Sequence, residues 1–100
     1  MKNLDLVTHI VINVSDLEAS KAWYQSSFNC EIIHQDSKNI RIRFNNVDLI
    51  LALPSSERHH VAYQKNNAET YGELLEKSDG RKSCYIADPT GNPVELVKCE

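Results

Sequence analysis

Three residues of types that bind metal ions stand out in this sequence: His9, His60 and Glu95. Each histidine opens a segment rich in apolar residues. Glu95 lies between Val94 and Leu96, so strand alternation points its carboxylate away from those neighbours, either towards water or into a polar cavity. Two imidazoles and one carboxylate, with coordination positions left open, suit a divalent transition metal that also binds substrate oxygens. Spacing alone favours three ordinary polar strand residues.

The first half of the chain predicts the element order βαβββ. Residues 6–14 are rich in β-branched side chains, which is typical of a strand buried on at least one face. Ser15 and Glu18 have the spacing of a capping box, which predicts a helix running to about Phe28. Three further strands are expected at 30–34, 39–44 and 47–53.

The middle one of these strands alternates cleanly. Ile40 and Ile42 are expected on one face, and Arg41 and Arg43 on the other. Two neighbouring arginines could bind an anionic substrate, or they could simply lie on an exposed sheet face. Asn45-Asn46 predicts a two-residue hairpin turn, because asparagine tolerates positive φ.

The second half restarts in the same way. A short strand is expected at 60–64, and a helix capped by Asn66 is expected to extend to about Lys77. Strands follow at 83–87 and 93–98, joined by the turn-rich segment 88–92. Since the helix leads almost directly into the first of these strands, the second half is predicted to lack one strand.

The two halves form a faint internal repeat. His9-Ile-Val-Ile before one helix parallels His60-Val-Ala-Tyr before the other, and Val47-Asp-Leu-Ile parallels Val94-Glu-Leu-Val. This order predicts an α+β fold of two modules, 1–54 and an abbreviated 59–100, within a single domain of residues 1–100. A repeat of this kind can also bring the three metal-binding residue types together.

Composition narrows the functional classes. Hydrophobic residues make up 41% and charged residues 25%, with a net charge of −3. No basic stripe alternates with aromatic residues, so no nucleic-acid partner is expected. The apolar runs are too short to span a bilayer, and nothing resembles a signal peptide, so a cytoplasmic protein without a membrane partner is predicted. Cys30, Cys84 and Cys99 have neither zinc nor redox spacing and are expected to be incidental thiols, a nucleophilic cysteine being the alternative.

Three segments resemble the glyoxalase/bleomycin resistance protein/extradiol dioxygenase superfamily, also called vicinal oxygen chelate (VOC) proteins. Residues 8–24 are similar to its opening strand and helix, and residues 60–63 to the strand that opens its second module. Residues 85–96 are similar to its closing hairpin, in which Asp-Pro-x-Gly-Asn precedes a strand with a glutamate. The resemblance covers essentially the whole chain and implies paired βαβββ modules whose mixed, curved sheet forms a half-barrel.

The resemblance implies that His9, His60 and Glu95 hold one divalent ion (Mn, Fe, Ni, Zn or Co), with Glu95 also catalytic. Glyoxalase I enzymes add a fourth ligand on the strand corresponding to 47–53, where Ile50 is apolar. Asp48 shares its parity and could substitute, although a solvated position beside the turn is the expectation.

Four other residues are less clearly assigned. Tyr63 and Tyr85 could line a substrate cavity, but core or rim packing explains strand tyrosines as well. His59 would replace His60 as a ligand if the register shifted by one residue. His34 has no partner in the pattern and is expected at the surface.

Three functions therefore stay open. The first is a metal-dependent enzyme acting on a small vicinal-oxygen substrate, as a lyase or isomerase, a thiol transferase or a dioxygenase. The second is a metal-free protein that binds a small molecule or antibiotic. The third is a truncated, non-catalytic interaction module. A homodimer is expected from the resemblance, and the sheet edge exposed by the missing strand gives another reason to expect association.

Overall fold

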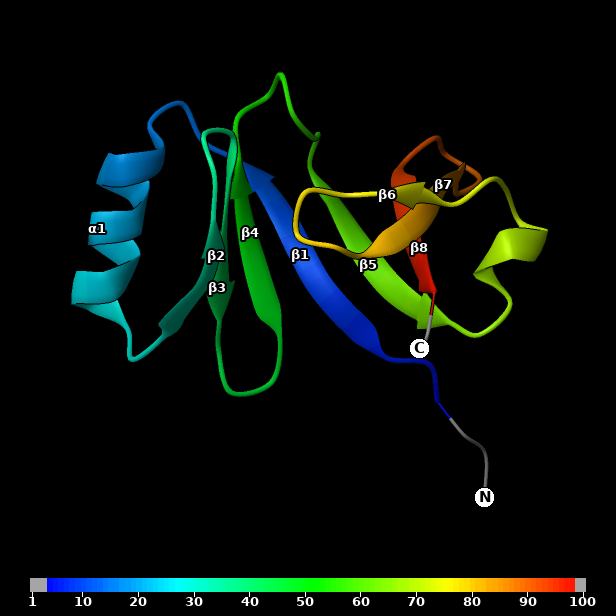
Figure 1. The fold of residues 1–100 in the computed structure, drawn as a ribbon, viewed down its shortest axis with the longest axis horizontal. Coiled ribbons are helices and arrows are strands. Elements are labelled where there is room, and N and C mark those ends of the chain that lie inside the picture. Colours follow the sequence, from blue (N-terminus) through cyan, green and yellow to red (C-terminus); the bar gives the residue numbers. More distant parts are fainter. Residues whose placement is uncertain (1–3, 99–100) are drawn as a thin grey trace. The chain divides into compact units, whose positions relative to one another are not determined.

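The computed structural model describes residues 4–98 of the chain, which divide into two compact units (Figure 1). The first unit is His9–His59. The second unit, in its described part, combines residues 4–8 with residues 60–98.

The first unit is a small mixed sheet with one helix against it. Its strands have the order β2-β3-β4-β1; β1 pairs with β4 in parallel, and the other neighbours are antiparallel. Its elements are β1 (Val7–Asn13, whose first two residues belong to the second unit), α1 (Leu17–Ser27), β2 (Glu31–Gln35), β3 (Asn39–Arg43) and β4 (Asp48–Ala52).

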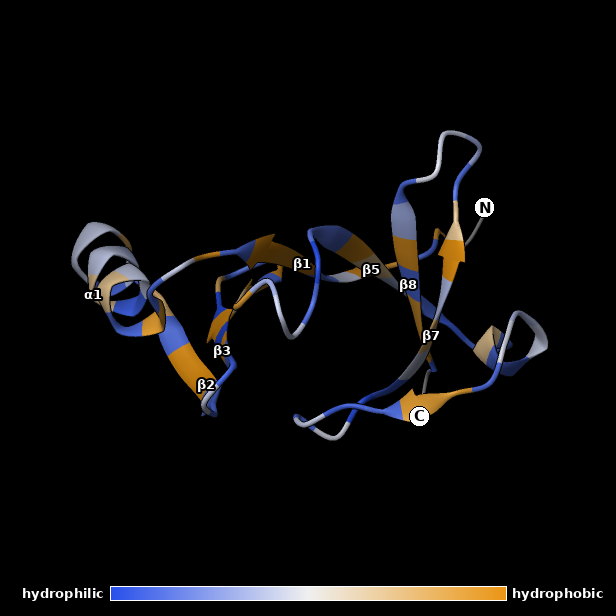
Figure 2. Ribbon diagram, turned by 90° about the horizontal axis from the view of Figure 1, so that it is seen from above, coloured by the Kyte–Doolittle hydropathy of each residue, from blue (hydrophilic) through white to orange (hydrophobic). Residues whose placement is uncertain are grey.

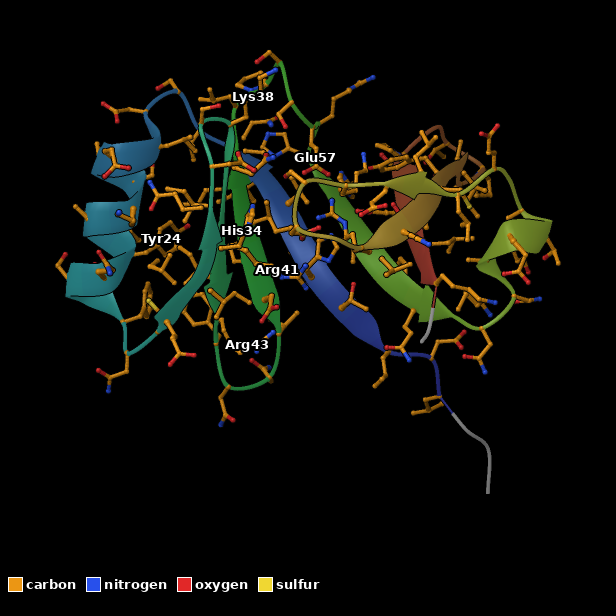
Figure 3. The ribbon with its side chains drawn as sticks, in the orientation of Figure 1. Tyr24, His34, Lys38, Arg41, Arg43 and Glu57 are labelled. Atoms are coloured by element: carbon orange, nitrogen blue, oxygen red, sulfur yellow. The ribbon has the colours of Figure 1, made fainter. Side chains whose placement is uncertain are left out.

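The helix α1 covers one face of this sheet. Ile40, Ile42 and Leu51 are fully buried there, and Leu17 and Tyr24 of α1 pack against them. Tyr24 extends from α1 towards the strands (Figure 3), and orange hydrophobic segments run along β2 and β3 (Figure 2). The expected alternation in β3 is confirmed, because Arg41 and Arg43 lie on the opposite face from the isoleucines.

The start of α1 differs from the prediction. Asp16, not Ser15, is the N-cap: its Oδ1 accepts a hydrogen bond of 3.0 Å from the backbone N–H of Ala19. Glu18 therefore does not complete a capping box and instead lies 3.3 Å from the Lys21 ammonium group. The cap shifts by one residue because Asp16 has the extended backbone of an N-cap, and its carboxylate accepts a backbone hydrogen bond as the Ser15 hydroxyl was expected to do.

The turn predicted at Asn45-Asn46 joins β3 to β4, and the Phe44 N–H donates to the Val47 carbonyl at 3.1 Å. It does not use positive φ, however. Between residues 4 and 98 only Gly80 and Gly91 have positive φ.

The second unit is another mixed sheet, with the strand order β5-β8-β7-β6. Strands β5 and β8 are parallel, and the other pairs are antiparallel. Residues 4–8 run along β5, where the Gln64 N–H donates to the Leu6 carbonyl at 2.9 Å. The elements are β5 (His60–Lys65), the 3-10 turn η1 (Ala68–Thr70), β6 (Leu75–Glu76), β7 (Lys82–Ala87) and β8 (Pro93–Lys98).

The helix predicted from Asn66 to Lys77 is wrong. Only η1 forms, and the chain then returns as the two-residue strand β6, which pairs with β7. The strand expected to be missing is thus present in short form, and the helix is the abbreviated element. A single turn suffices to bury Ala68 against Cys84, and Gly72, a weak helix former, lies within the segment expected to be helical.

Candidate metal centre

The two faces of the second unit have opposite character. One face is apolar, with Ala68, Cys84 and Leu96 buried together. Because side chains alternate along strands, the other face receives Glu95 from β8 and Tyr85 from β7, which are direct cross-strand partners. Polar residues are thereby gathered on the face that η1 does not cover.

On this face His60 and Glu95 form a buried pair. Nε2 of His60 lies 2.7 Å from Oε1 of Glu95, and the two side chains are 2% and 0% exposed. The ring of Tyr85 meets the His60 ring edge-on, with centroids 5.2 Å apart, and the Lys77 ammonium group lies 4.7 Å from the Tyr85 centroid. The imidazole is therefore held between a carboxylate and an aromatic ring.

The second oxygen of Glu95 is held by two other side chains. Ser83 Oγ donates to Oε2 at 2.6 Å, and Arg81 Nε donates to the same oxygen at 2.7 Å. Arg81 Nη1 in turn donates to Oδ2 of Asp79 at 2.6 Å. The result is a continuous chain of charge-assisted hydrogen bonds that fixes the Glu95 carboxylate.

The chemistry of this group fits a divalent transition metal. It offers an imidazole nitrogen and a carboxylate oxygen, both of which such ions accept. Two carboxylates, those of Asp79 and Glu95, share the single guanidinium group of Arg81, and carboxylate charge attracts a cation.

His9 is fully buried in the first unit, where its strand position is opposite Asp48. The expectation that Asp48 is solvated is wrong. Its side chain is 8% exposed and accepts hydrogen bonds from Arg41 Nε at 2.7 Å and from Arg43 Nε at 3.0 Å. Both arginines extend from β3 (Figure 3). Asp48 is thus committed to two guanidinium groups, which makes it a poor candidate for a fourth ligand.

The electrostatics of Asp48 follow from these contacts. Burial alone would raise the pKa of its carboxyl group, but the hydrogen bonds from Arg43 and Arg41 and their charges outweigh burial, so the pKa is lowered. Asp48 is therefore ionised at neutral pH and neutralises part of the positive charge of β3.

The remaining predicted residues lie elsewhere. Tyr63 packs into the apolar cluster with Ala68 on the face opposite Glu95, so it does not line the His60–Glu95 group. His59 is exposed, and its Nδ1 accepts from the Asn13 N–H at 3.2 Å. His34 is partly exposed, with Nε2 3.1 Å from Asp36.

Sequence reasoning missed Arg81, Asp79 and Ser83. The signal for Ser83 was available, because the hairpin around the 88–92 turn pairs Tyr85 with Glu95 and alternation then places Ser83 on the same face. Arg81 lies in the turn before β7, where no periodicity fixes the direction of a side chain.

Neither described cysteine belongs to the polar group. Cys30 and Cys84 are thiols without a disulfide, and burial raises the pKa of the Cys84 thiol. Cys99 lies outside the described residues.

Within residues 4–98 no helix has the length and apolar character needed to cross a membrane.

The family model for the glyoxalase/bleomycin resistance protein/dioxygenase superfamily matches residues 6–74, and the chain belongs to this superfamily. None of the curated proteins compared with the chain matches it in sequence. The matched segment contains His9 and His60, whereas Glu95 and its Arg81 and Ser83 partners lie beyond it.

Solved structures show the same fold. Methylmalonyl-CoA epimerase from Mycobacterium tuberculosis is 16% identical with a TM-score of 0.76, over 100% of this chain and 93% of that one. The Streptomyces coelicolor epimerase (S115T) in complex with 2-nitronate-propionyl-CoA is 18% identical with a TM-score of 0.79, over 96% and 95%. A superfamily member from Vibrio splendidus 12B01 is 14% identical with a TM-score of 0.70, over 96% and 100%. The predicted α+β fold of paired modules is confirmed.

Proposed function

We propose that this chain is a metal-dependent enzyme of the superfamily, with His9, His60 and Glu95 as ligands of one divalent ion. The observation that carries the proposal is the buried 2.7 Å contact between His60 and Glu95, whose second oxygen is already held by other side chains. His9 is included because metal-using members that the opening strand resembles place a ligand there, and because it is a fully buried histidine.

The chemistry assigned to the site follows from its donors. A bound divalent ion would act as a Lewis acid towards vicinal oxygens of a small substrate. His60 and Glu95 would hold that ion in a water-poor environment, since both are buried, and Tyr85 would keep the His60 ring in place. Lyase or isomerase, thiol transferase and dioxygenase reactions all use such a centre.

Arg41 and Arg43 are proposed to bind an anionic group of the substrate. The Arg43 side chain is 57% exposed and therefore reachable, although Asp48 and the cross-strand Glu31 balance much of the charge of the two arginines. Tyr85 is proposed to line the substrate site because it shares a face with Glu95 and contacts His60.

Metal analysis tests the proposal directly. Protein purified without chelator is expected to contain about one divalent ion per chain. His60→Ala and Glu95→Gln should each lose it, while His59→Ala, which alters an exposed neighbour, should retain it. Equal metal content in the wild type and both ligand variants would refute the assignment.

A metal-free binding protein is the second candidate, and one observation favours it: both Glu95 oxygens have hydrogen-bond partners within the chain. The buried group would then be a structural ion-pair network. This candidate predicts a wild-type chain that retains no metal yet shows a raised melting temperature when bleomycin is added.

The oligomeric state is a further part of the proposal. We infer a cytoplasmic homodimer from the resemblance to dimeric members of the superfamily. Large apolar side chains on the surface, among them Trp23 at 57% and Leu75 at 56% exposure, are compatible with a partner surface. The edge argument no longer supports it, because β6 occupies the edge that was expected to be vacant. Light scattering of the purified chain measures the mass.

A further inference from the structure

We propose that Arg81 is a positioning residue that makes Glu95 a single-oxygen metal ligand. This inference rests on the proposed function and extends it to side chains that touch the ligand rather than the ion. The geometry divides the carboxylate: Oε2 accepts from Arg81 Nε and Ser83 Oγ, whereas Oε1 is directed to His60 Nε2. Oε1 is therefore the oxygen offered to the ion.

Arg81 is itself fixed on its other side. Its Nη1 donates to Asp79 at 2.6 Å, and the side chains of both residues are 8% exposed. One guanidinium group thus spans two carboxylates, which its planar fork allows and a lysine ammonium group does not reproduce. Arg81 is thus held between Asp79 and Glu95 by contacts within the chain itself.

The turn before β7 provides this arrangement. Gly80 has φ +92°, which a glycine adopts readily, and its N–H donates to the Lys77 carbonyl at 2.9 Å. The Lys77 N–H closes the turn onto the Arg81 carbonyl at 2.8 Å. Asp79 and Arg81 therefore leave the turn side by side and close to β8.

The charge of Arg81 and its orienting contact to Glu95 should affect metal affinity in opposite directions, so an experiment can separate the two effects. As a nearby positive charge, Arg81 opposes binding of a cation, so its removal by itself would tighten metal binding. As a residue that orients Glu95, it assists binding, and loss of such a contact to a metal ligand typically weakens metal affinity by roughly 10- to 100-fold. Arg81→Lys keeps the charge and removes the fork, so it isolates the positioning effect.

The experiment is a Co²⁺ titration of the metal-depleted chain, followed by visible absorption, for the wild type, Arg81→Lys, Arg81→Gln and Ser83→Ala. Lys82→Arg, at the exposed neighbouring position of β7, is the control. We expect Arg81→Lys and Ser83→Ala to bind Co²⁺ about tenfold more weakly with an altered absorption band, and the control to match the wild type. Ser83→Ala keeps the test valid if Arg81 variants do not fold.

Two other outcomes are decisive. The positioning role alone would be overturned if Arg81→Lys and Ser83→Ala both had the Co²⁺ affinity and spectrum of the wild type. It would also be overturned if Arg81→Gln bound Co²⁺ more tightly while Arg81→Lys bound it as the wild type does. Failure of the wild-type chain to bind Co²⁺ would overturn the proposed metal centre and this inference together.

Discussion

Ile50 occupies in the first unit the register position that Glu95 occupies in the second. Ile50 faces Val11, two residues after His9, and Glu95 faces Ala62, two residues after His60. The sequence repeat aligned Asp48 with Glu95, but the strand register shifts this match by two residues, so the counterpart of the Glu95 carboxylate is a fully buried isoleucine. The strand that supplies a fourth ligand in glyoxalase I enzymes is apolar here at this position.

Ile50→Glu tests this relationship. Without metal, the variant should be destabilised by about 3 kcal/mol or more, because it removes a packed side chain and buries a carboxylate. Because Ile50 holds the repeat position of Glu95, added Zn²⁺ should raise the melting temperature of the variant more than that of the wild type. Ile50→Gln has similar size without the charge and should gain less. Equal Zn²⁺ shifts in Ile50→Glu and Ile50→Gln would contradict the prediction.

Asp48→Asn should reveal how the β3 arginines are neutralised. Because the folded-state pKa of Asp48 lies below its ordinary value of 3.8, the carboxylate stabilises the fold at neutral pH, and this contribution is lost as the pH falls through the folded pKa. We expect Asp48→Asn to lower the free energy of unfolding by about 1–3 kcal/mol at pH 7. The difference should shrink towards pH 3 in urea titrations.

A matched control exists on the surface of the second unit. Glu69 pairs with Lys98 at 2.7 Å, and the pKa of Glu69 is also lowered, chiefly by that hydrogen bond. Because Glu69 is exposed and Lys98 only half-buried, Glu69→Gln should change stability little at any pH. A pH-independent effect of Asp48→Asn would show that the Asp48 charge is not what stabilises the wild type.

Cys84 should be inert in the native protein. Its thiol is buried, burial raises its pKa, and its Sγ donates to the Ala68 carbonyl at 3.4 Å. Peptide mapping after iodoacetamide treatment at pH 8 should find Cys84 unmodified in the folded chain and modified in urea. Rapid labelling of Cys84 in the native state would revive the nucleophilic alternative.

The sequence was sufficient for most strands and for the alternation within them. Alternation placed Ile40 and Arg41 on opposite faces, and the 88–92 turn signal placed the connection between β7 and β8. These predictions succeed because a period of two and a tight turn together determine register.

The failures have a common physical origin in tertiary contacts. The helix expected after Asn66 had acceptable local signals, but pairing of β6 with β7 competes with it. Burial of Asp48 could not be foreseen either, since the two arginines that compensate its charge come from a different strand. Arg81 reaches Glu95 from a turn, where pattern carries no directional information.

Gly91→Ala should destabilise the chain, whereas Gly72→Ala should not. Gly91 has φ +90° in the turn between β7 and β8, and an added Cβ would meet nothing within 4 Å, so the cost is purely conformational and about 1 kcal/mol. At Gly72 the added Cβ would lie 3.5 Å from Cys84 Cβ, an ordinary contact without positive φ. Alanine there should be neutral or stabilising by up to about 1 kcal/mol, because it restricts the unfolded chain. Urea unfolding of the two variants measures the difference in the free energy of unfolding. Equal destabilisation would mean that the positive φ of Gly91 does not determine the turn between β7 and β8, which aligns Glu95 with Tyr85.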